Sequence, residues 1–352
     1  MAKSQSLVRN GGRAGLTGFG AILALIAILA LPIPACSPVT RGQLEIEMPP
    51  APQFDPANER FISFDGAELG LTVWEAEGEP DVVVVGLHGM NDWANAFHMA
   101  APYWAERGVT TYAYDHRGFG RSPHKGLWPK EELMREDLRA AVRIARDRHP
   151  DTRIAVVGIS MGGAVAASAF GSDDVPDADL LVLSGPGFRG WGALPLAYQA
   201  SLWVSARVRP GWVVTPPRRV VRIEPTDNIE MLREMWAHPN MTRENRIDQV
   251  HGVVSLMETA HDRVSNIPAG IPVFVTYGAK DIVIPPNAMA RSAKVLPTHA
   301  RTAYYENGYH MILRDLDSER VHADTLAFLL DPASDLPSGA PAIPWAPSQS
   351  TP

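Results

Sequence analysis

The chain has 352 residues, with 39 acidic and 32 basic side chains, and a formal net charge of −7 at pH 7. Because no block of Lys and Arg interrupts this acidic balance, the sequence has no electrostatic footprint for nucleic acid, and we expect no nucleic-acid partner. The length is sufficient for one large α/β domain with an insertion. The only cysteine, Cys36, excludes an internal disulfide.

The N-terminus has the features of an export signal. Lys3, Arg9 and Arg13 precede an apolar run over residues 19–31, which is short for a bilayer span but typical of a signal-peptide core. The segment Pro-Ile-Pro-Ala-Cys-Ser that follows resembles a bacterial lipobox, in which Cys36 would be lipidated and become the mature N-terminus. We therefore predict a signal segment over 1–36 and an envelope lipoprotein attached to a membrane surface at Cys36. An uncleaved N-terminal anchor and plain secretion are the alternatives.

Composition sets the predicted limits of the folded body. Five prolines between residues 37 and 58 predict an extended linker outside the core, and the Pro, Ser and Ala content of 331–352 predicts a disordered tail. Between them, short apolar runs alternate with helical patterns, which is typical of a mostly parallel sheet with crossover helices. The eight predicted strands are 60–64 and 69–75, which flank an Asp-Gly hairpin signal, and then 82–85, 110–114, 154–157, 180–183, 273–277 and 302–305.

One interval between strands is too long for a simple crossover. Roughly eighty residues follow the strand at 180–183, so we predict a helical cap over 186–266, inserted into a core made of 59–185 and 267–330. The first part of the cap is unusually apolar. We expect Trp191, Leu202 and Trp203 to bind substrate by lining an entry channel for acyl chains or by contacting lipid. The alternative is that these side chains only pack the cap onto the body.

A Gly-x-Ser-x-Gly motif, residues 158–162, lies between a predicted strand and a small-residue helix that begins at Gly163. In such a turn the serine backbone is strained, and the flanking glycines leave room for that conformation. The serine hydroxyl then stands at the N-terminus of the helix. Ser160 is therefore the candidate nucleophile.

A serine nucleophile needs a base, and the base needs a group that holds it in the right tautomer. Asp281 follows the predicted strand 273–277, and His310 lies in the loop after the strand 302–305. The carboxyl ends of strands are where open α/β sheets place their sites. We therefore assign His310 as the base and Asp281 as its orienting acid, with Glu306 and Asp315 as possible substitutes for Asp281.

Acyl transfer also needs donors for the anion that forms on the substrate oxygen. One predicted donor is the backbone amide of Met161, directly after the nucleophile at the start of a helix. The second is the backbone amide of Met90, in the loop Leu-His-Gly-Met-Asn-Asp that follows the strand 82–85. We expect His88 to brace that loop.

The chain resembles the monoacylglycerol lipase and lysophospholipase group of α/β-hydrolases over about residues 60–330. The resemblance is carried by five motifs: His88-Gly89, the segment 114–122 (Tyr-Asp-His-Arg-Gly-Phe-Gly-Arg-Ser), the serine motif, the Asp281 loop and the Gly-Tyr-His of 308–310. The order serine, aspartate, histidine is also that of this fold. The resemblance implies an α/β-hydrolase fold, with an eight-stranded sheet flanked by helices and a helical cap over a tunnel for one acyl chain. It also implies that the polar side chains of 114–122 brace neighbouring loops.

The predicted function is that of a serine ester hydrolase acting on monoacylglycerol-like or lysophospholipid-like amphiphiles through an acyl-enzyme on Ser160. This chemistry needs no metal or organic cofactor, and no His, Cys and Asp cluster in the sequence has metal-ligand spacing. Three rivals remain: an acyltransferase with the same triad, a peptidase similar to proline iminopeptidases, and a non-catalytic envelope lipoprotein. The peptidase is disfavoured because the loop after 82–85 lacks the His-Gly-Gly-Pro-Gly run of those enzymes. The oligomeric state is left open.

Overall fold

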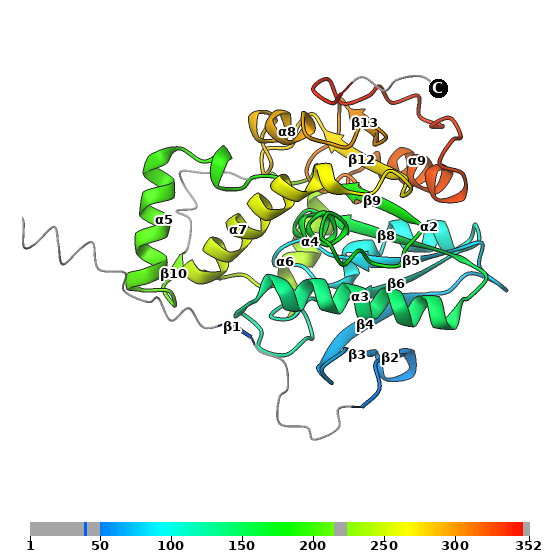
Figure 1. Ribbon diagram of the computed structural model, residues 1–352, viewed down its shortest axis with the longest axis horizontal. Coiled ribbons are helices and arrows are strands. Elements are labelled where there is room, and N and C mark those ends of the chain that lie inside the picture. The colour runs from blue at the N-terminus through cyan, green and yellow to red at the C-terminus, as the bar shows by residue number, and fades with distance from the viewer. Residues whose placement is uncertain (1–38, 41–49, 215–223, 348–352) are drawn as a thin grey trace, which may run out of the picture. The chain divides into compact units, whose positions relative to one another are not determined.

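The computed structural model describes residues 39, 40, 50–214 and 224–347, which form a large, mostly parallel sheet flanked by helices (Figure 1). The sheet has nine strands in the order β13-β12-β9-β8-β5-β6-β4-β3-β2. The predicted mostly parallel sheet is confirmed, with one strand more than the eight expected. The strands are β2 (Gln53–Asp55), β3 (Arg60–Ile62), β4 (Glu68–Trp74), β5 (Val82–Leu87), β6 (Val109–Tyr114), β8 (Arg153–Ile159), β9 (Leu180–Ser184), β12 (Val273–Gly278) and β13 (Arg301–Tyr305).

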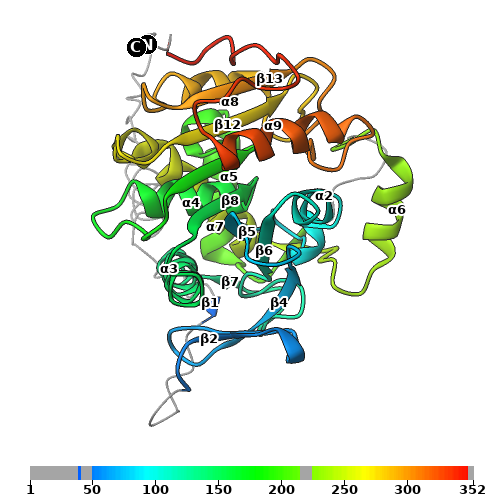
Figure 2. The ribbon, with the colours of Figure 1, turned by 90° about the vertical axis from the view of Figure 1, so that its right-hand side faces the viewer.

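The central strands are buried on both faces, as their β-branched runs predict. Val83 and Val85 of β5 belong to the core on one face, whereas Val82 and Val84 belong to the core on the other. Figure 2 shows helices on both sides of the sheet, with α3 and α4 on one side and α2 and α9 on the other. The helices of the body are α2 (Ala100–Ala105), α3 (Glu131–Arg148), α4 (Met161–Phe170), α8 (Pro286–Ala293) and α9 (Ser318–Leu330), with single 3₁₀ turns at Pro56–Asn58, Ala94–Phe97 and Val264–Asn266.

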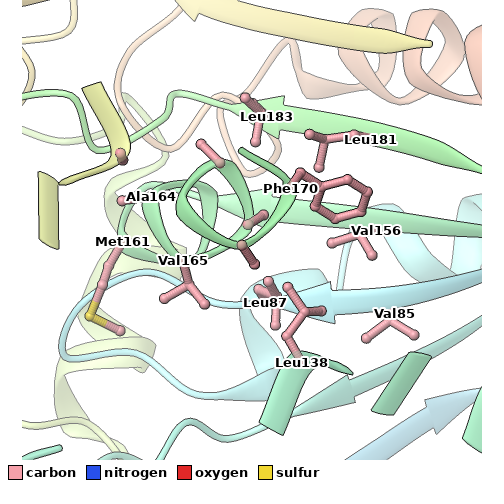
Figure 3. Close-up of a cluster of buried hydrophobic side chains, with 14 of the residues drawn as sticks. Val85, Leu87, Leu138, Val156, Met161, Ala164, Val165, Phe170, Leu181 and Leu183 are labelled. Atoms are coloured by element: carbon pink, nitrogen blue, oxygen red, sulfur yellow. The ribbon is translucent and has the colours of Figure 1, made fainter. Parts of the chain in front are cut away.

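Helix α4 lies at the centre of the larger core, and every one of its residues is buried. Its side chains are small except at Met161, Val165 and Phe170, so the helix packs closely against the strands. Figure 3 shows these three residues among Leu87, Val156 and the neighbouring strand side chains. Tight packing on all sides holds the first residue of α4, and therefore Ser160 just before it, in a fixed position.

The described parts of the predicted cap, 186–214 and 224–266, contain three helices and a two-stranded sheet. Its elements are the 3₁₀ turn Trp191–Ala193, α5 (Leu196–Val208), β10 (Val213–Val214), α6 (Ile229–Ala237), β11 (Asn245–Arg246) and α7 (Ile247–Arg263), with β10 and β11 antiparallel. The boundary predicted at residue 266 needs correction. Leu256, Ala260 and Val264 are buried in the same core as α4, so the second half of α7 belongs to the body.

The predicted linker over 37–58 is partly wrong. Its last residues form β2, which pairs with β3, and Phe54 packs between Phe61 and Tyr112 with 1% of its surface exposed. Further upstream, β1 (Val39–Thr40) pairs in parallel with β7 (Trp128–Pro129). A single aromatic residue therefore suffices to draw a proline-rich segment onto the edge of the sheet, where proline is tolerated.

The predicted disorder of 331–352 is wrong for residues 331–347. Ile343 is 2% exposed, and its amide donates a hydrogen bond to Thr302 Oγ1. Trp345 packs against Tyr277 and Tyr304, each of which is one residue before the end of its strand, β12 or β13. Two apolar side chains thus outweigh the polar composition of the segment and attach it behind the strands that carry Asp281 and His310.

The predicted signal segment 1–36, with Cys36, lies outside the described residues. Within 50–214 and 224–347, no helix is long and apolar enough to cross a membrane.

The buried position of Ile343 makes the C-terminal segment part of the stability of the body. Ile343→Ala should lower the free energy of unfolding by about 2 to 4 kcal/mol, because it removes a core side chain and leaves a cavity. Urea unfolding followed by tryptophan fluorescence measures this loss. Asp335→Ala, at an exposed position of the same segment, is the matched control and should be neutral within about 0.5 kcal/mol. Equal stability of the two variants would contradict the packing.

Candidate active site

Ser160 has the strained backbone that the serine motif predicts, with φ 50° and ψ −113°. A positive φ is rare for a residue with a side chain and costs of order 1–3 kcal/mol. Three backbone hydrogen bonds hold it: its amide donates to Ser184 O at 3.1 Å, and its carbonyl accepts from Ala164 N at 3.0 Å and Gly187 N at 2.8 Å. The hydroxyl therefore occupies one position at the carboxyl edge of the sheet.

The two glycines of the motif are required by close approach. A β-carbon on Gly162 would lie 2.3 Å from Leu87 O, and one on Gly158 would lie 2.7 Å from Gly162 O. Both contacts are with backbone atoms, which cannot move aside as a flexible side chain could. Helix α4 can approach β5 at Gly162, and β8 at Gly158, only because these side chains are absent.

Ser160, His310 and Asp281 form a continuous chain of hydrogen bonds. Ser160 Oγ lies 2.9 Å from His310 Nε2, and His310 Nδ1 lies 2.7 Å from Asp281 Oδ2. All three side chains are buried. An ionised carboxylate can only accept, so Nδ1 carries the ring proton and Nε2 is left to accept the proton of the serine hydroxyl.

Asp281 is fixed by the turn that follows β12. Its second oxygen, Oδ1, accepts hydrogen bonds from Val283 N and Ile284 N, each at 2.8 Å. The loops that carry Asp281 and His310 are also joined to each other, since Ala279 N donates to Tyr305 O and Lys280 N donates to Gly308 O, each at 2.9 Å. The substitutes considered for Asp281 lie elsewhere: Glu306 is exposed, and Asp315 accepts from Tyr309 N at 2.7 Å.

The two predicted anion donors lie on either side of Ser160. Met161 is the first residue of α4, and Met90 follows Gly89, where a β-carbon would lie 3.3 Å from Ser160 Cβ. Within the described segments, no residue accepts a hydrogen bond from the amide of Met90 or Met161. Both amides are therefore free to donate to a substrate oxygen, and their role as anion donors stays a prediction.

His88 braces the loop that carries Met90. Its Nδ1 lies 2.7 Å from Gly89 O, and its Nε2 accepts from His116 N at 2.9 Å. Complete burial lowers the pKa of His88, which keeps the ring neutral with its proton on Nδ1. The bracing role expected of His88 is confirmed.

The polar side chains of 114–122 also form the structural contacts that were expected. Arg117 is buried and makes paired hydrogen bonds to Asp137 and Asp65 at 2.7–2.9 Å. Asp115 accepts from Ala94 N and from Arg121, and so ties the segment to the loop after β5. These contacts hold the loops around the site.

A buried ion pair joins the loop of Met90 to the loop of His310. Arg314 is paired with Asp92, and both side chains are almost fully buried. Sequence reasoning missed this pair, because nothing in the sequence relates positions 92 and 314; they meet only through the strand order of the sheet. The one available signal was Asp92 itself. A charged residue two positions after the predicted anion donor Met90 indicates that a cationic partner lies nearby.

The α6 part of the cap is bound to both of these loops. Thr242 N donates to Asn91 O at 2.9 Å, and His238 stacks on Trp93 with ring centroids 4.5 Å apart. On the other side, Pro225 O accepts from Met311 N at 2.8 Å, the residue directly after His310. This part of the cap is therefore attached at both ends of the site.

An apolar cavity of about 480 Å³ lies between the cap and the Asp281 loop. Leu202 lines it, as predicted. Trp191 and Trp203 do not: Trp191 donates to Ser255 Oγ at 3.1 Å, and Trp203 is 48% exposed with the Arg207 guanidinium 3.6 Å from its ring centroid. The lining residues are Arg189, Leu194, Tyr198, Ser201, Leu202, Ser205, Val214, Ile247, Val250, Val253, Val254, Met257, Val283 and Ile284.

The cavity approaches the nucleophile through Gly187. A β-carbon at Gly187 would lie 3.0 Å both from Met257 Cε, which lines the cavity, and from Ser160 O.

Among residues 50–214 and 224–347, no cluster of three or more His, Cys, Asp or Glu side chains could hold a metal ion. The arrangement is a serine, histidine and aspartate chain with an apolar space beside it.

A family model described as serine aminopeptidase, S33, matches residues 78–317, more than half of the chain. The chain belongs to this family. A monoacylglycerol lipase of Mycolicibacterium smegmatis is 26% identical over 275 residues, which cover 77% of this chain and 95% of that protein. These findings confirm that the protein belongs with the α/β-hydrolases of the monoacylglycerol lipase group.

Solved structures confirm the α/β-hydrolase fold. The monoacylglycerol lipase of Paleococcus ferrophilus has a TM-score of 0.58 at 21% identity, covering 75% of this chain and 98% of its own. A soluble variant of the monoglyceride lipase of Saccharomyces cerevisiae has a TM-score of 0.60 at 15% identity, covering 83% and 98%. At these identities the likeness establishes the fold alone.

The buried pair Asp92 and Arg314 should contribute strongly to stability, because removal of one partner leaves the other charge buried and unpaired. We expect Arg314→Met to lower the free energy of unfolding by about 3–5 kcal/mol in urea unfolding experiments. The double variant Asp92→Leu with Arg314→Met should recover part of that loss. Arg320→Met, which removes an exposed partner of Asp317, is the control and should change stability by less than about 0.5 kcal/mol. Equal losses at Arg314 and Arg320 would contradict the role of the buried pair.

Proposed function

We propose that the protein hydrolyses monoacylglycerol-like or lysophospholipid-like esters through an acyl-enzyme on Ser160. The observation that carries the proposal is the unbroken chain from Ser160 Oγ through His310 to Asp281, next to an apolar cavity. The class of enzyme, a serine ester hydrolase, follows from the family and its monoacylglycerol lipase relatives.

In the first step, Ser160 Oγ attacks the ester carbonyl carbon while its proton passes to His310 Nε2. Asp281, acting on His310 Nδ1, stabilises the imidazolium that forms. The negative oxygen of the tetrahedral intermediate accepts from the free amides of Met90 and Met161. His310 then gives its proton to the leaving alcohol oxygen, and the acyl group remains on Ser160.

In the second step, water repeats the attack. His310 Nε2 takes a proton from the water, the hydroxide adds to the acyl carbon, and the proton returns to Ser160 Oγ as the fatty acid leaves. The fixed tautomer of His310 serves both steps. No metal or organic cofactor enters this scheme.

The substrate class is supported by the cavity and by the relatives. A volume of about 480 Å³ with mostly apolar lining is of the size that takes one small ligand or acyl chain. Two of the relatives are themselves named monoacylglycerol lipases. An ester with one acyl chain in the cavity and its carbonyl at Ser160 satisfies both observations.

The family description favours one rival, an aminopeptidase with the same triad. Such an enzyme needs an acidic group to bind the free amine of its substrate. No Asp or Glu lines the cavity in the described part of the chain. The ester hydrolase therefore fits the cavity better. An acyltransferase remains open as a variant in which an alcohol replaces water in the second step.

The location of the protein is a separate proposal. The lipobox-like segment supports an envelope lipoprotein attached to a membrane at Cys36, and an uncleaved N-terminal anchor is the alternative. Cys36→Ser should leave an unlipidated precursor, which mass spectrometry of the purified protein distinguishes from the diacylated form. A wild-type protein that keeps residues 1–35 and no lipid on Cys36 would support the anchor instead.

The proposed activity predicts a complete dependence on Ser160. With the full chain in neutral detergent, wild type should hydrolyse p-nitrophenyl esters and monoacylglycerols, with a maximum at medium or long acyl chains. Ser160→Ala should lower kcat by about 10⁴-fold or more while the melting temperature stays close to wild type. Ser265→Ala, at an exposed serine away from the site, is the control. Activity on aminoacyl p-nitroanilides without activity on esters would favour the peptidase.

A further inference from the structure

The cavity beside Ser160 contains one charged side chain, Arg189. The guanidinium is partly buried, and its Nη1 donates to Val283 O at 3.1 Å. In the described part of the chain, no carboxylate forms an ion pair with Arg189. A guanidinium has five N–H donors, so one bond to a carbonyl leaves both its charge and most of its donors without a partner.

Arg189 is two residues after Gly187, where the cavity approaches Ser160. Its acceptor, Val283 O, belongs to the same turn whose amides hold Asp281 Oδ1. Leu202 and Tyr198 of α5 line the cavity from the cap. An acyl chain directed toward α5 would therefore have its ester end, and not its methyl end, next to Arg189.

The sequence around Arg189 has an unusual charge balance. From residue 180 to residue 214 there are three arginines, Arg189, Arg207 and Arg209, and no Asp or Glu, although the whole chain has a net charge of −7. A local excess of positive charge raises the concentration of anionic ligands and the rate at which they arrive. A guanidinium without an ion pair and a chain segment without acidic residues favour the same sign of ligand.

We propose that Arg189 is a specificity-determining residue that binds the anionic head group of a monoacyl phospholipid. The inference rests on the proposed ester hydrolysis and selects one of its two substrate classes. A phosphate close to the ester accepts from the free N–H groups of Arg189, which bind phosphate in paired geometry. A neutral monoacylglycerol leaves the charge of the guanidinium and most of its donors without a partner, and a site with unpaired polar groups discriminates against such a ligand. Anionic lysophospholipids are therefore the preferred substrates.

The carboxylate of the released fatty acid is a second anion that can accept hydrogen bonds from Arg189. A product bound to Arg189 would inhibit the enzyme without favouring an anionic substrate. The experiment must therefore measure substrate preference and product inhibition in the same variants.

The test uses the full chain in neutral detergent and two substrates with the same acyl chain, 1-dodecanoyl lysophosphatidylglycerol and 1-monododecanoylglycerol. Wild type should have the higher kcat/KM on the lysophospholipid. Arg189→Met should raise KM for that substrate by about 10- to 100-fold, the range for a hydrogen bond to a charged group, with kcat within about threefold. For the neutral ester, both constants should change by less than about threefold. Arg189→Lys should recover part of the preference because it restores the charge.

The matched control is Arg207→Met, which removes the same charge from the cap surface, where Arg207 stacks on Trp203 outside the cavity. It should change the preference by less than about twofold. An equal loss with Arg207→Met would assign the preference to the general field of the cap and overturn the role of Arg189. An equal loss on both substrates with Arg189→Met would mean that Arg189 only holds the turn at Val283, which would also overturn it.

Two further outcomes separate this inference from its alternatives. If Arg189→Met relieves inhibition by dodecanoate but leaves the substrate preference unchanged, the guanidinium binds the product, and the head-group assignment is wrong. If wild type hydrolyses neither substrate in a Ser160-dependent manner, the proposed function itself fails. Ser160-dependent hydrolysis of both substrates without a preference overturns only the inference about Arg189.

Discussion

The hydrogen bond between Ser160 and His310 joins residues that are 150 positions apart, and the rest of the structure can be understood as what makes it possible. Strands β8, β12 and β13 run parallel within one sheet, so the loops after them open at the same edge. Helix α4 must begin immediately after Ser160 and lie against β5 and β8, which requires glycine at 162 and at 158, respectively. The strain at Ser160 persists because buried packing around α4 leaves the backbone no other arrangement.

Sequence reasoning located the reactive residues because each has a local signature. Ser160 lies in a five-residue motif, and Asp281 and His310 each follow a short apolar strand, so position along the chain was enough to place them at one edge. It failed where a few long-range contacts outweigh local composition. Phe54 and Ile343 lie in segments rich in proline, yet each is almost fully buried because it fills space in the core. The side chains against which Phe54 and Ile343 pack could not be deduced from the sequence of their own segments.

The cap shows a second kind of failure. Aromatic content correctly indicated an apolar cap, but it could not tell side chains that face the cavity, such as Leu202, from those that face outward, such as Trp203. Spacing on a helix shows which residues share a face without showing what that face meets. The pair of Asp92 with Arg314 and the unpaired Arg189 were missed for the same reason, since isolated charges acquire meaning only from their surroundings in three dimensions.

The cap and the body together form one site. One part of the cap, around α6, is attached to the loops of Met90 and His310 on both sides of the site, and another, α5 with the start of α7, encloses the apolar cavity. The first part can hold the catalytic groups in register, while the second can select the substrate. This division gives a role to the 88 residues between the end of β9 at Ser184 and the start of β12 at Val273, more than a simple crossover requires.

The central claim is that the hydroxyl of Ser160 forms a covalent bond with the acyl group of the substrate. The most direct test is intact-protein mass spectrometry of wild type, mixed with a slowly turned-over p-nitrophenyl ester and quenched in acid within the first turnovers. Peptide mapping of the quenched protein then gives the modified residue. The account predicts a mass increase equal to one acyl group, located on Ser160, that disappears as substrate is exhausted. Turnover without any adduct, or an adduct on another residue, would contradict it.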